Sequence, residues 1–466
     1  LAFAGFDGLS EVAPDIRVRR QGDAVALIAA DREVREFPLP AKGDSEAWGR
    51  LTAAVLQAGW AASPDLRRRQ PEQIYRSMFS GVVEKLDGYS RYSDATSAEQ
   101  ARASREGFGG IGITVGPPEA GRVRIDKLLP DAPAAHAGLA ERDEIVEIDG
   151  EPVQGLEQSE IVDRLRGPVD SQVLLGVLRG GRRLDVMVTR AHIVPNTVSY
   201  ERQDDIAYFR VGSFNRHTTS DLRQLVLAAQ REIGPDLKGL ILDLRGNPGG
   251  LLDQAVSAAD LFLDQGTIVA TRGRHPASNS VFTATEDDIA EGLPIAVLIN
   301  GKSASASEML AAALQDQGRA VVVGSASHGK GSVQNVVRMP NGGELIITWS
   351  RMVAPSGYIL DRLGVLPAIC TSGAAGRDPI AHLPELRQDG ARNFAAWHAY
   401  TTADEVVART LRLACPAEQA ERDEDIAVAQ RLLREPKGYR LALRPWTAAS
   451  MMAEQAASPP DGRTLQ

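Results

Sequence analysis

The sequence is poor in the residues that build metal centres and disulfide frameworks. It holds 2 cysteines and 7 histidines. The cysteines do not stand at Cys-x-x-Cys spacing and no His-Glu-x-x-His motif occurs, which argues against a structural zinc site or a zincin-type enzyme. We therefore expect neither a metal nor a cofactor. Any chemistry must come from serine, lysine, aspartate, glutamate or the backbone.

The sequence also lacks a long apolar run and an excess of basic residues. No run approaches the roughly 18 apolar residues of a membrane span. The formal net charge of −9 comes without the basic stripe of a nucleic-acid surface. We expect no membrane span and no nucleic-acid partner. The length of 466 residues, of which 43% are hydrophobic and 24% charged, predicts a globular protein of about two to four domains.

The ends of the chain bear on its compartment. The sequence opens at Leu1, and Ala2-Phe3-Ala4 has the small-x-small pattern of a signal cleavage site. A chain that simply begins within an alanine-rich segment would show the same three residues. We expect a missing signal peptide and a periplasmic or otherwise extracytoplasmic protein. Cys370 and Cys415 could then form one disulfide, or remain two buried thiols, and the sequence leaves both open.

The first part of the chain is predicted to consist of short strands followed by helices. Alternating apolar runs at 16–19, 24–28 and 34–37 are broken by Gly and Asp, which is typical of a small β-meander. Helices are predicted over 45–61 and 71–86.

A compact module follows, and after it an α/β core. Residues 105–192 combine strands, a short helix closed by Gly138, a longer helix and a closing hairpin. From residue 207 onward, apolar strands of the fully buried kind alternate with helices, as at 239–244 and 295–299. This alternation predicts a layered α/β fold.

One serine-rich segment stands where a buried strand gives way to a helix. Residues 300–308 read Asn-Gly-Lys-Ser-Ala-Ser-Ala-Ser-Glu. A hydroxyl at a helix start lies beside unpaired backbone N–H groups, which is where a nucleophile gains an oxyanion site. The serines could equally cap the helix, with Glu308 completing a capping box. For this segment alone, capping is the simpler interpretation.

Two glycine-rich turns follow other predicted strands. Residues 243–250, Asp-Leu-Arg-Gly-Asn-Pro-Gly-Gly, let backbone N–H groups approach an anion, though a tight strand-to-helix turn would need the same glycines. Residues 324–330 nearly match the phosphate-binding pattern GxxxxGK. Gly331 stands where Ser or Thr should bind magnesium, and no helix follows, so the sequence argues against nucleotide binding.

Taken together and in order, the motifs resemble the carboxy-terminal processing peptidases, or tail-specific proteases, of peptidase family S41. They read GGIGI, PAxxAGL, DEIVEIDG, DLRGNPGGLLDQAV, NGKSASASEML and GKGSVQ, and the resemblance covers residues 86–364. It implies a multidomain α/β protein whose protease core is similar to the crotonase and Clp-protease folds. The implied domains are an N-terminal region (1–104), a PDZ domain (105–192), the protease core (193–369) and a C-terminal extension (370–466).

The resemblance also implies functional residues. The family's nucleophile falls on Ser305, its general base on Lys330 and its supporting amide on Gln334. The oxyanion donors fall on the backbone N–H of Ala306 and on that of Gly249 or Gly250, between which the sequence does not choose. The implied PDZ loop that receives a substrate carboxylate consists of Gly110, Ile111, Gly112 and Ile113.

The chemical properties of these residues fit the roles that the resemblance implies. A lysine base must be neutral although its free pKa is about 10.4, and burial in an apolar site can lower it by several units. Gly329 and Gly331 would let the chain bring Lys330 close to its partner. A peptide C-terminus can add as a strand to a sheet edge, where backbone N–H groups hold its carboxylate.

The roles of three further charged residues do not follow from the resemblance. Lys302 replaces a residue that is usually small in the family's pattern, and we expect it to face solvent. Arg164 and Arg166 lie near a predicted turn of the PDZ domain. They either make switch contacts or are solvated surface charges.

The resemblance implies an ATP-independent serine endopeptidase that cleaves proteins near their C-termini after PDZ recognition of the tail. Its partners would be proteins or peptides with exposed C-termini. The sequence leaves open whether an adaptor protein binds and whether the chain forms a homodimer. A catalytically silent PDZ scaffold is the first alternative, and the intact set of Ser305, Lys330 and Gln334 argues against it. An acyl-CoA enzyme of crotonase type is the second, and the PDZ-like module and Lys330 argue against it.

Overall fold

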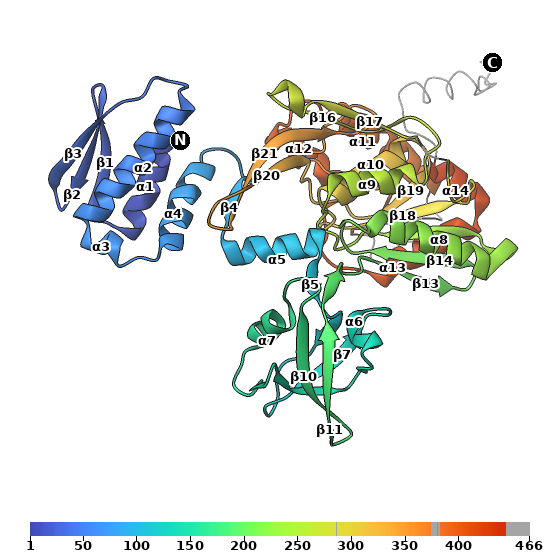
Figure 1. The fold of residues 1–466 in the computed structure, drawn as a ribbon. Helices are drawn as coiled ribbons and strands as arrows, with labels where there is room; N and C mark the ends of the chain where they lie inside the picture. Colours follow the sequence, from blue (N-terminus) through green and yellow to red (C-terminus); the bar gives the residue numbers. More distant parts are fainter. Residues whose placement is uncertain (286, 374–379, 381–382, 444–466) are drawn as a thin grey trace, which may run out of the picture.

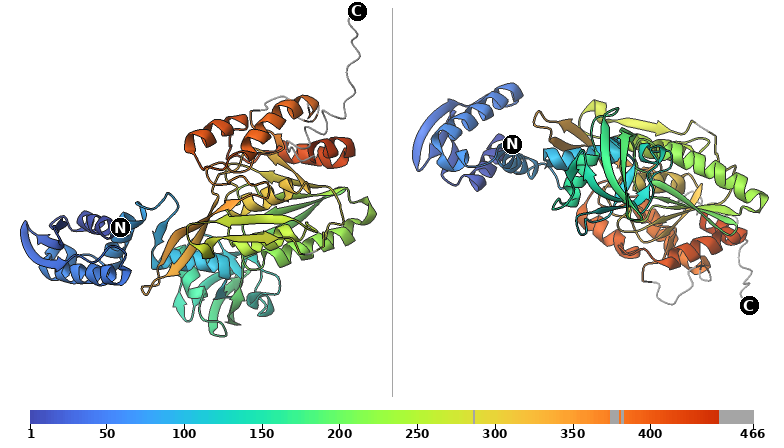
Figure 2. Two further views of the ribbon diagram at one scale, coloured as in Figure 1. Left: turned by 90° about the horizontal axis from the view of Figure 1, so that it is seen from above. Right: turned by 60° about the horizontal axis from the view of Figure 1, so that its bottom comes forward.

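Residues 1–83 form a small α/β unit in the computed structural model, which describes residues 1–285, 287–373, 380 and 383–443. Antiparallel strands in the order β1-β2-β3 pack with the helices around a core that includes Phe6, Leu27 and Val55. Figures 1 and 2 show this unit to one side of the rest. Its elements are α1 (Ala2–Val12), β1 (Ile16–Gln21), β2 (Ala24–Ala29), β3 (Arg32–Pro38), α2 (Ser45–Ala62), α3 (Pro64–Arg67) and α4 (Pro71–Val83).

The predictions for this unit are largely confirmed. The meander and both helices are present, but α4 ends at Val83 rather than at residue 86. Helix α1 was not predicted. Its apolar residues pack on α4, and it has a glycine on that side: a Cβ on Gly8 would lie 2.3 Å from the Ser77 carbonyl oxygen. Close helix packing, which the local sequence does not announce, therefore holds α1 in place.

A short strand and a helix lead from this unit to the next. They are β4 (Arg91–Ser93) and α5 (Ala95–Glu106). Strand β4 pairs antiparallel with β21 (Glu344–Val353), which lies far along the chain. The Asp94 side chain caps α5 by accepting the Ser97 N–H at 2.8 Å. The link is thus fixed to the later part of the molecule by strand pairing.

The compact module has its own sheet and its own core. The sheet order is β11-β10-β8-β7-β6, with β9 beside β8, and the core includes Val123, Ile145 and Val173. Strand β5 pairs with β12, so the chain enters and leaves through adjacent strands that form a neck (Figure 1). The elements are β5 (Phe108–Gly110), β6 (Ile113–Val115), β7 (Val123–Leu128), α6 (Pro133–His136), β8 (Glu144–Ile148), β9 (Glu151–Pro152), α7 (Gln158–Leu165), β10 (Gln172–Arg179), β11 (Arg182–Thr189) and β12 (Ala191–Ile193).

A six-stranded sheet lies at the centre of the remaining chain. Its order is β13-β14-β15-β18-β19-β22, and the strands from β14 to β22 run parallel. Every residue of β15, β18 and β19 is buried, as predicted for β15 and β18. The strands are β13 (Val198–Gln203), β14 (Ile206–Val211), β15 (Gly239–Asp243), β18 (Ile295–Ile299), β19 (Ala320–Gly324) and β22 (Ile369–Cys370).

Helices cover both faces of this sheet, and successive side chains along each strand point to opposite faces. Leu240 and Leu242 of β15 join the core under one set of helices, and Ile241 joins the core under the other. The first set is α8 (Thr218–Ile233), α9 (Leu252–Asp260) and α10 (Ala306–Asp316); the second is α13 (Asp423–Arg434) and α14 (Pro436–Leu443). A 3₁₀ turn, η1 (Gly234–Asp236), follows α8.

A second sheet lies next to α9 and α10. Its order is β17-β16-β21-β20, with β4 beside β21, and β16 contacts both helices. Its remaining elements are β16 (Thr267–Arg272), η2 (Pro276–Ser278), β17 (Ser280–Thr283) and β20 (Ser332–Arg338). Strands β16 and β17 were not predicted from the sequence.

The C-terminal part returns to the central sheet. It contains α11 (Leu383–His398), α12 (Glu405–Leu411) and η3 (Arg412–Ala414) before α13. Cys370 and Cys415 form a disulfide, one of the two alternatives that the sequence left open. No helix in the described parts of the chain is both long and apolar enough to cross a membrane. Residues 444–466 of the expected C-terminal extension lie outside the described residues.

Candidate active site

Three turns meet at one edge of the central sheet. They follow β15, β18 and β19, which are parallel neighbours, so their carboxyl ends lie side by side. The glycine turn (244–251) follows β15, the nucleophile turn (300–305) follows β18, and the lysine turn (325–331) follows β19. The sheet thus brings together three motifs that are distant in the sequence.

The three serines of the nucleophile segment differ in accessibility. Ser303 and Ser307 are fully buried. The Ser303 hydroxyl donates to the Leu244 carbonyl at 2.8 Å, and the Ser307 hydroxyl donates to the Asn247 carbonyl at 3.0 Å. Ser305 is only partly buried. The outer two serines therefore fasten the turn of the predicted nucleophile, called the nucleophile turn, to the glycine turn, and Ser305 is the one of the three that is not fully buried.

Ser305 has an unusual backbone conformation. It is the N-cap of α10 with φ 58° and ψ −115°, a region that L-residues rarely adopt. Its N–H donates to the Glu308 carboxylate at 2.7 Å, which holds the strained turn. A sharp strand-to-helix turn of this kind projects a serine hydroxyl away from the sheet. The next residue, Ala306, opens the helix, where backbone N–H groups lack intrahelical partners.

The two candidate glycines play different parts. A Cβ on Gly249 would lie 2.9 Å from Ser305 Cβ and 3.0 Å from Ala306 N, so glycine permits this close approach. The Gly249 N–H donates to the Asn247 side chain at 2.8 Å. The backbone of Gly250 instead packs against Phe214. Its N–H has no acceptor among the residues that the structure describes.

A fully buried carboxylate joins the nucleophile turn to the lysine turn. Glu308 accepts hydrogen bonds from Ser305 N–H (2.7 Å), Ser327 Oγ (2.6 Å), Gly329 N–H (2.6 Å) and Lys330 N–H (2.9 Å). Burial raises the pKa of Glu308, although these hydrogen bonds oppose the increase. The sequence indicated Glu308 only as a capping residue. Its link to the lysine turn depends on folding, and no spacing in the sequence reports it.

Lys330 lies in a setting that favours its neutral form. Burial lowers the pKa of Lys330, the positive charge of Arg91 lowers it further, and Glu308 acts in the opposite direction. Its Nζ is 5.9 Å from the centroid of the Tyr89 ring. A Cβ on the neighbouring Gly331 would lie 2.0 Å from the Asp361 nitrogen, so that glycine is needed for the close passage of two chain segments.

The structure places Ser305 and Lys330 on the same carboxylate but does not join their side chains. Among the described residues, no hydrogen bond connects Ser305 Oγ with Lys330 Nζ. Gln334, in β20, is likewise not bonded to Lys330. Its Nε2 donates to the Tyr89 carbonyl at 2.6 Å, and its Oε1 accepts from Arg91 at 3.4 Å.

Tyr89 and Arg91 are residues of the site that sequence reasoning missed. They come from a segment in which Tyr89 lies just before β4 and Arg91 is the first residue of β4, more than two hundred residues before Lys330. The Tyr89 hydroxyl donates to the Gly329 carbonyl at 3.3 Å. The pairing of β4 with β21 is what brings this segment to the site. No local pattern around Tyr89 could have indicated that contact.

The predicted carboxylate loop lies at the edge of the sheet of the compact module. It leads into β6, the last strand in the order β11-β10-β8-β7-β6. The Ile111 carbonyl accepts from Ala134 N–H at 3.0 Å, and the Gly112 carbonyl accepts from Leu129 N–H at 2.9 Å. These bonds fix the loop residues Gly110, Ile111, Gly112 and Ile113 against α6 and the turn before it. Strand β6 keeps one side that no other strand of the sheet covers.

The two arginines near this module make specific contacts. Arg164 forms an ion pair with Glu151 at 2.6 Å. The guanidinium of Arg166 lies 4.3 Å from the centroid of the Phe108 ring, a cation–π contact at the neck strand β5. They are therefore not simply solvated charges. Lys302, in contrast, is exposed as expected.

Comparison with known proteins finds two matching family models, similar curated proteins and a similar solved structure. The model of peptidase family S41 matches residues 205–371, and a PDZ domain model matches residues 124–179. A carboxy-terminal-processing protease of Bartonella bacilliformis is 41% identical over 302 residues, which cover 64% of this chain and 69% of that protein. A Staphylococcus aureus protein named probable CtpA-like serine protease is 30% identical over 308 residues, covering 65% and 61%. The solved photosystem II D1 C-terminal processing protease aligns at 26% identity with a TM-score of 0.38, covering 69% of this chain and 86% of that one.

Proposed function

This chain belongs to the carboxy-terminal-processing proteases of peptidase family S41, and we propose that it cleaves proteins near their C-termini with Ser305 as nucleophile and Lys330 as general base. The observation that carries the proposal is the shared carboxylate of Glu308. It holds the strained, accessible Ser305 and the backbone of Lys330 in one hydrogen-bonded unit. The lowered pKa of Lys330 favours the neutral amine that a base requires.

The reaction follows from these roles. Neutral Lys330 Nζ takes the proton of Ser305 Oγ as Oγ attacks the scissile carbonyl carbon. The oxyanion receives hydrogen bonds from Ala306 N–H and from the glycine turn. We assign the second donor to Gly250, because the Gly249 N–H is already bonded to Asn247. Lys330 then protonates the leaving amine, and a water molecule, deprotonated by Lys330, hydrolyses the acyl-enzyme ester.

Gln334 supports the base indirectly in this proposal. It fixes the Tyr89 carbonyl and contacts Arg91. Tyr89 in turn covers Lys330, and the charge of Arg91 lowers the lysine pKa. Gln334 is therefore a positioning residue that keeps the segment of Tyr89 and Arg91 against the lysine turn.

The PDZ domain supplies the substrate tail. We propose that a protein or peptide with an exposed C-terminus adds as a strand along β6 and places its carboxylate on backbone N–H groups of residues 110–113. The neck of β5 and β12 then directs the preceding residues toward Ser305. The Cys370–Cys415 disulfide supports an oxidising, extracytoplasmic location such as the periplasm.

A cleavage assay tests the catalytic pair. The substrate is a peptide with an apolar C-terminal tail, and the variants are Ser305→Ala and Lys330→Ala, with Lys302→Ala as the matched control. We expect both site variants to lose at least about 10³-fold in kcat, because each removes one partner of the proton transfer. Lys302→Ala should keep wild-type turnover, since its side chain is exposed. Full activity in either site variant contradicts the assignment.

A further inference from the structure

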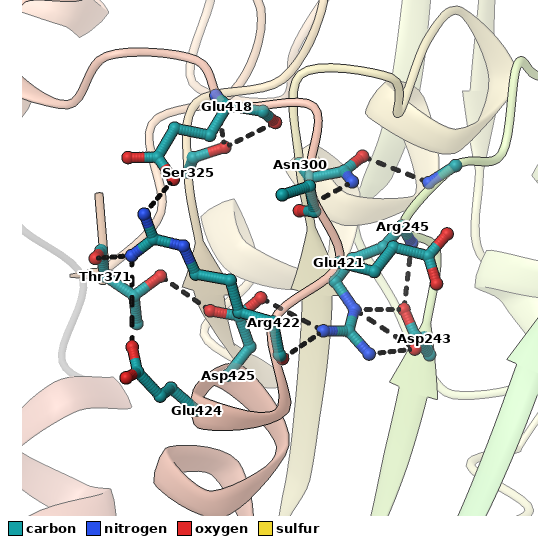
Figure 3. A network of polar contacts seen from close by, with 12 residues as sticks. Asp243, Arg245, Asn300, Ser325, Thr371, Glu418, Glu421, Arg422, Glu424 and Asp425 are labelled. Carbon is teal, nitrogen blue, oxygen red and sulfur yellow. Dashed lines mark hydrogen bonds and ion pairs between the residues drawn. The ribbon is translucent and has the colours of Figure 1, made fainter. Parts of the chain in front are cut away.

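One segment from the C-terminal part crosses all three turns of the active site. Residues 412–425, which we call the C-terminal strap, run from η3 to the start of α13 along the carboxyl ends of β15, β18 and β19. They lie outside the motifs that carry the family resemblance. Figure 3 shows the strap residues Glu418, Glu421, Arg422 and Asp425 beside Asn300 and Arg245.

The strap first contacts the lysine turn. Arg412 donates to the Ser327 carbonyl at 2.8 Å and to the Leu363 carbonyl at 2.5 Å. The Glu418 N–H donates to Ser325 Oγ at 3.0 Å. Between these contacts, the disulfide joins Cys415 to Cys370 at the end of β22. This part of the strap is therefore covalently anchored beside the lysine turn.

The strap then contacts the nucleophile turn. The Glu418 carbonyl accepts the Gly301 N–H at 2.7 Å. The Asn300 side-chain amide donates to the carbonyls of Gln419 and Ala420, both at 3.3 Å. The Asn300 side-chain oxygen accepts the Gly246 N–H at 3.0 Å, which belongs to the glycine turn. Buried Asn300 thus connects the strap with two of the three turns.

The strap ends on the glycine turn through a buried ion pair (Figure 3). Arg245 donates to the Arg422 carbonyl at 2.6 Å and to the Asp425 carboxylate at 3.1 Å. It also pairs with Asp243 at 2.7 Å. The other Asp425 oxygen accepts from the Thr371 hydroxyl at 2.7 Å. Arg245, Asp243 and Asp425 are all buried, so each charge depends on its partners.

We propose that the C-terminal strap sets the mutual positions of the lysine, nucleophile and glycine turns, with Asp425 as a positioning residue that acts through Arg245. The inference rests on the proposed roles of these turns in catalysis. A displacement of about 1 Å between reacting groups can cost about 10²-fold in rate. Among the described residues, the strap forms no hydrogen bond or ion pair with the PDZ edge at 110–115, so its loss should reduce the chemical step and leave tail binding intact.

The test compares two neighbouring carboxylates. Asp425→Asn removes the charge facing Arg245, whereas Glu424→Gln removes a charge whose side chain is 71% accessible and whose ion pair with Arg422 spans 3.9 Å. On the tailed peptide, Asp425→Asn should lower kcat by about 10- to 100-fold, with KM changed by less than about twofold and the pH profile unmoved. Glu424→Gln should match wild type. An unchanged kcat in Asp425→Asn, or a loss fully accounted for by unfolded protein, overturns the proposal.

A second readout does not depend on turnover. The double variant Cys370→Ala/Cys415→Ala removes the anchor without changing charge, and it serves also if Asp425→Asn does not fold. Amide hydrogen exchange should rise in residues 244–251, 300–305 and 325–331, and stay unchanged in β7 and β10 of the PDZ domain. Uniform or unchanged exchange overturns the strap proposal. Absence of wild-type cleavage would instead refute the proposed function, and the exchange result would still decide the role of the strap.

Discussion

The nucleophile turn and the lysine turn are held in different ways. Core residues fix the nucleophile turn from within: Ser303 and Ser307 are buried and bonded to the glycine turn. The lysine turn is covered from outside by Tyr89 and Arg91, which precede the whole PDZ domain in the sequence. The position of Ser305 is thus set by the protease fold itself. The position of Lys330 depends in addition on a segment that ties the N-terminal unit to the second sheet.

Glu308 connects the nucleophile turn with the lysine turn. Its replacement should therefore have the largest effect on turnover. In Glu308→Gln, an NH₂ group replaces one of the two carboxylate oxygens that accept hydrogen bonds. This NH₂ donor would then face backbone N–H donors. We expect kcat to fall by about 10³-fold and the free energy of unfolding to fall by about 3 kcal/mol. Peptide turnover and thermal or urea unfolding measure the two effects.

Glu344→Gln is the matched control for this variant. Glu344 is equally buried, but its carboxylate pairs with Arg102 and Arg105 of α5, and in the described part of the chain it bonds to none of the three turns. The Glu344→Gln variant should have a lower free energy of unfolding, whereas kcat per folded molecule should stay at the wild-type value. If Glu308→Gln behaves like Glu344→Gln, the carboxylate of Glu308 does not join the two halves of the site.

Arg91 tests the outer cover of the lysine turn through the pH dependence. Its positive charge disfavours the protonated form of Lys330 and so lowers the lysine pKa. In Arg91→Gln that pKa rises, and a larger fraction of Lys330 is protonated at neutral pH. The acidic limb of the kcat/KM profile should therefore move to higher pH.

The control for Arg91 is an arginine elsewhere on the surface. Arg409 is exposed on α12 and pairs with Glu405 within the same helix. Arg409→Gln should leave the acidic limb in place. A limb that stays fixed in Arg91→Gln, or moves to lower pH, would show that Arg91 does not influence the base.

Tyr89 should give the smallest effect. Tyr89→Phe keeps the ring near Lys330 and removes the hydroxyl that donates to the Gly329 carbonyl. The loss of one partly exposed hydrogen bond predicts a decrease of about two- to fivefold in kcat. Tyr92→Phe is the control, because its hydroxyl bonds to Glu72 and Asn341 rather than to the lysine turn. Equal kcat values for the two variants would remove the phenol of Tyr89 from the site.

Much of the fold followed from local patterns. The buried strands β15, β18 and β19 are runs of aliphatic residues bounded by glycine and polar turns, and such runs can be read without tertiary information. Strands β16 and β17 were missed because they carry mixed polar residues and pair only within the second sheet. Helix α1 was missed because its close packing on α4 involves glycine, which disfavours helices by itself.

The sequence alone predicted which residues carry the chemistry. The order and spacing of its motifs indicated the protease family, Ser305, Lys330 and the glycine turn. The tertiary structure decided how these residues are held: Glu308 bridges two turns, Tyr89 and Arg91 cover the lysine, and the C-terminal strap binds all three turns. These contacts join segments many residues apart. Their existence depends on strand pairing and on the satisfaction of buried charges, which no local pattern records.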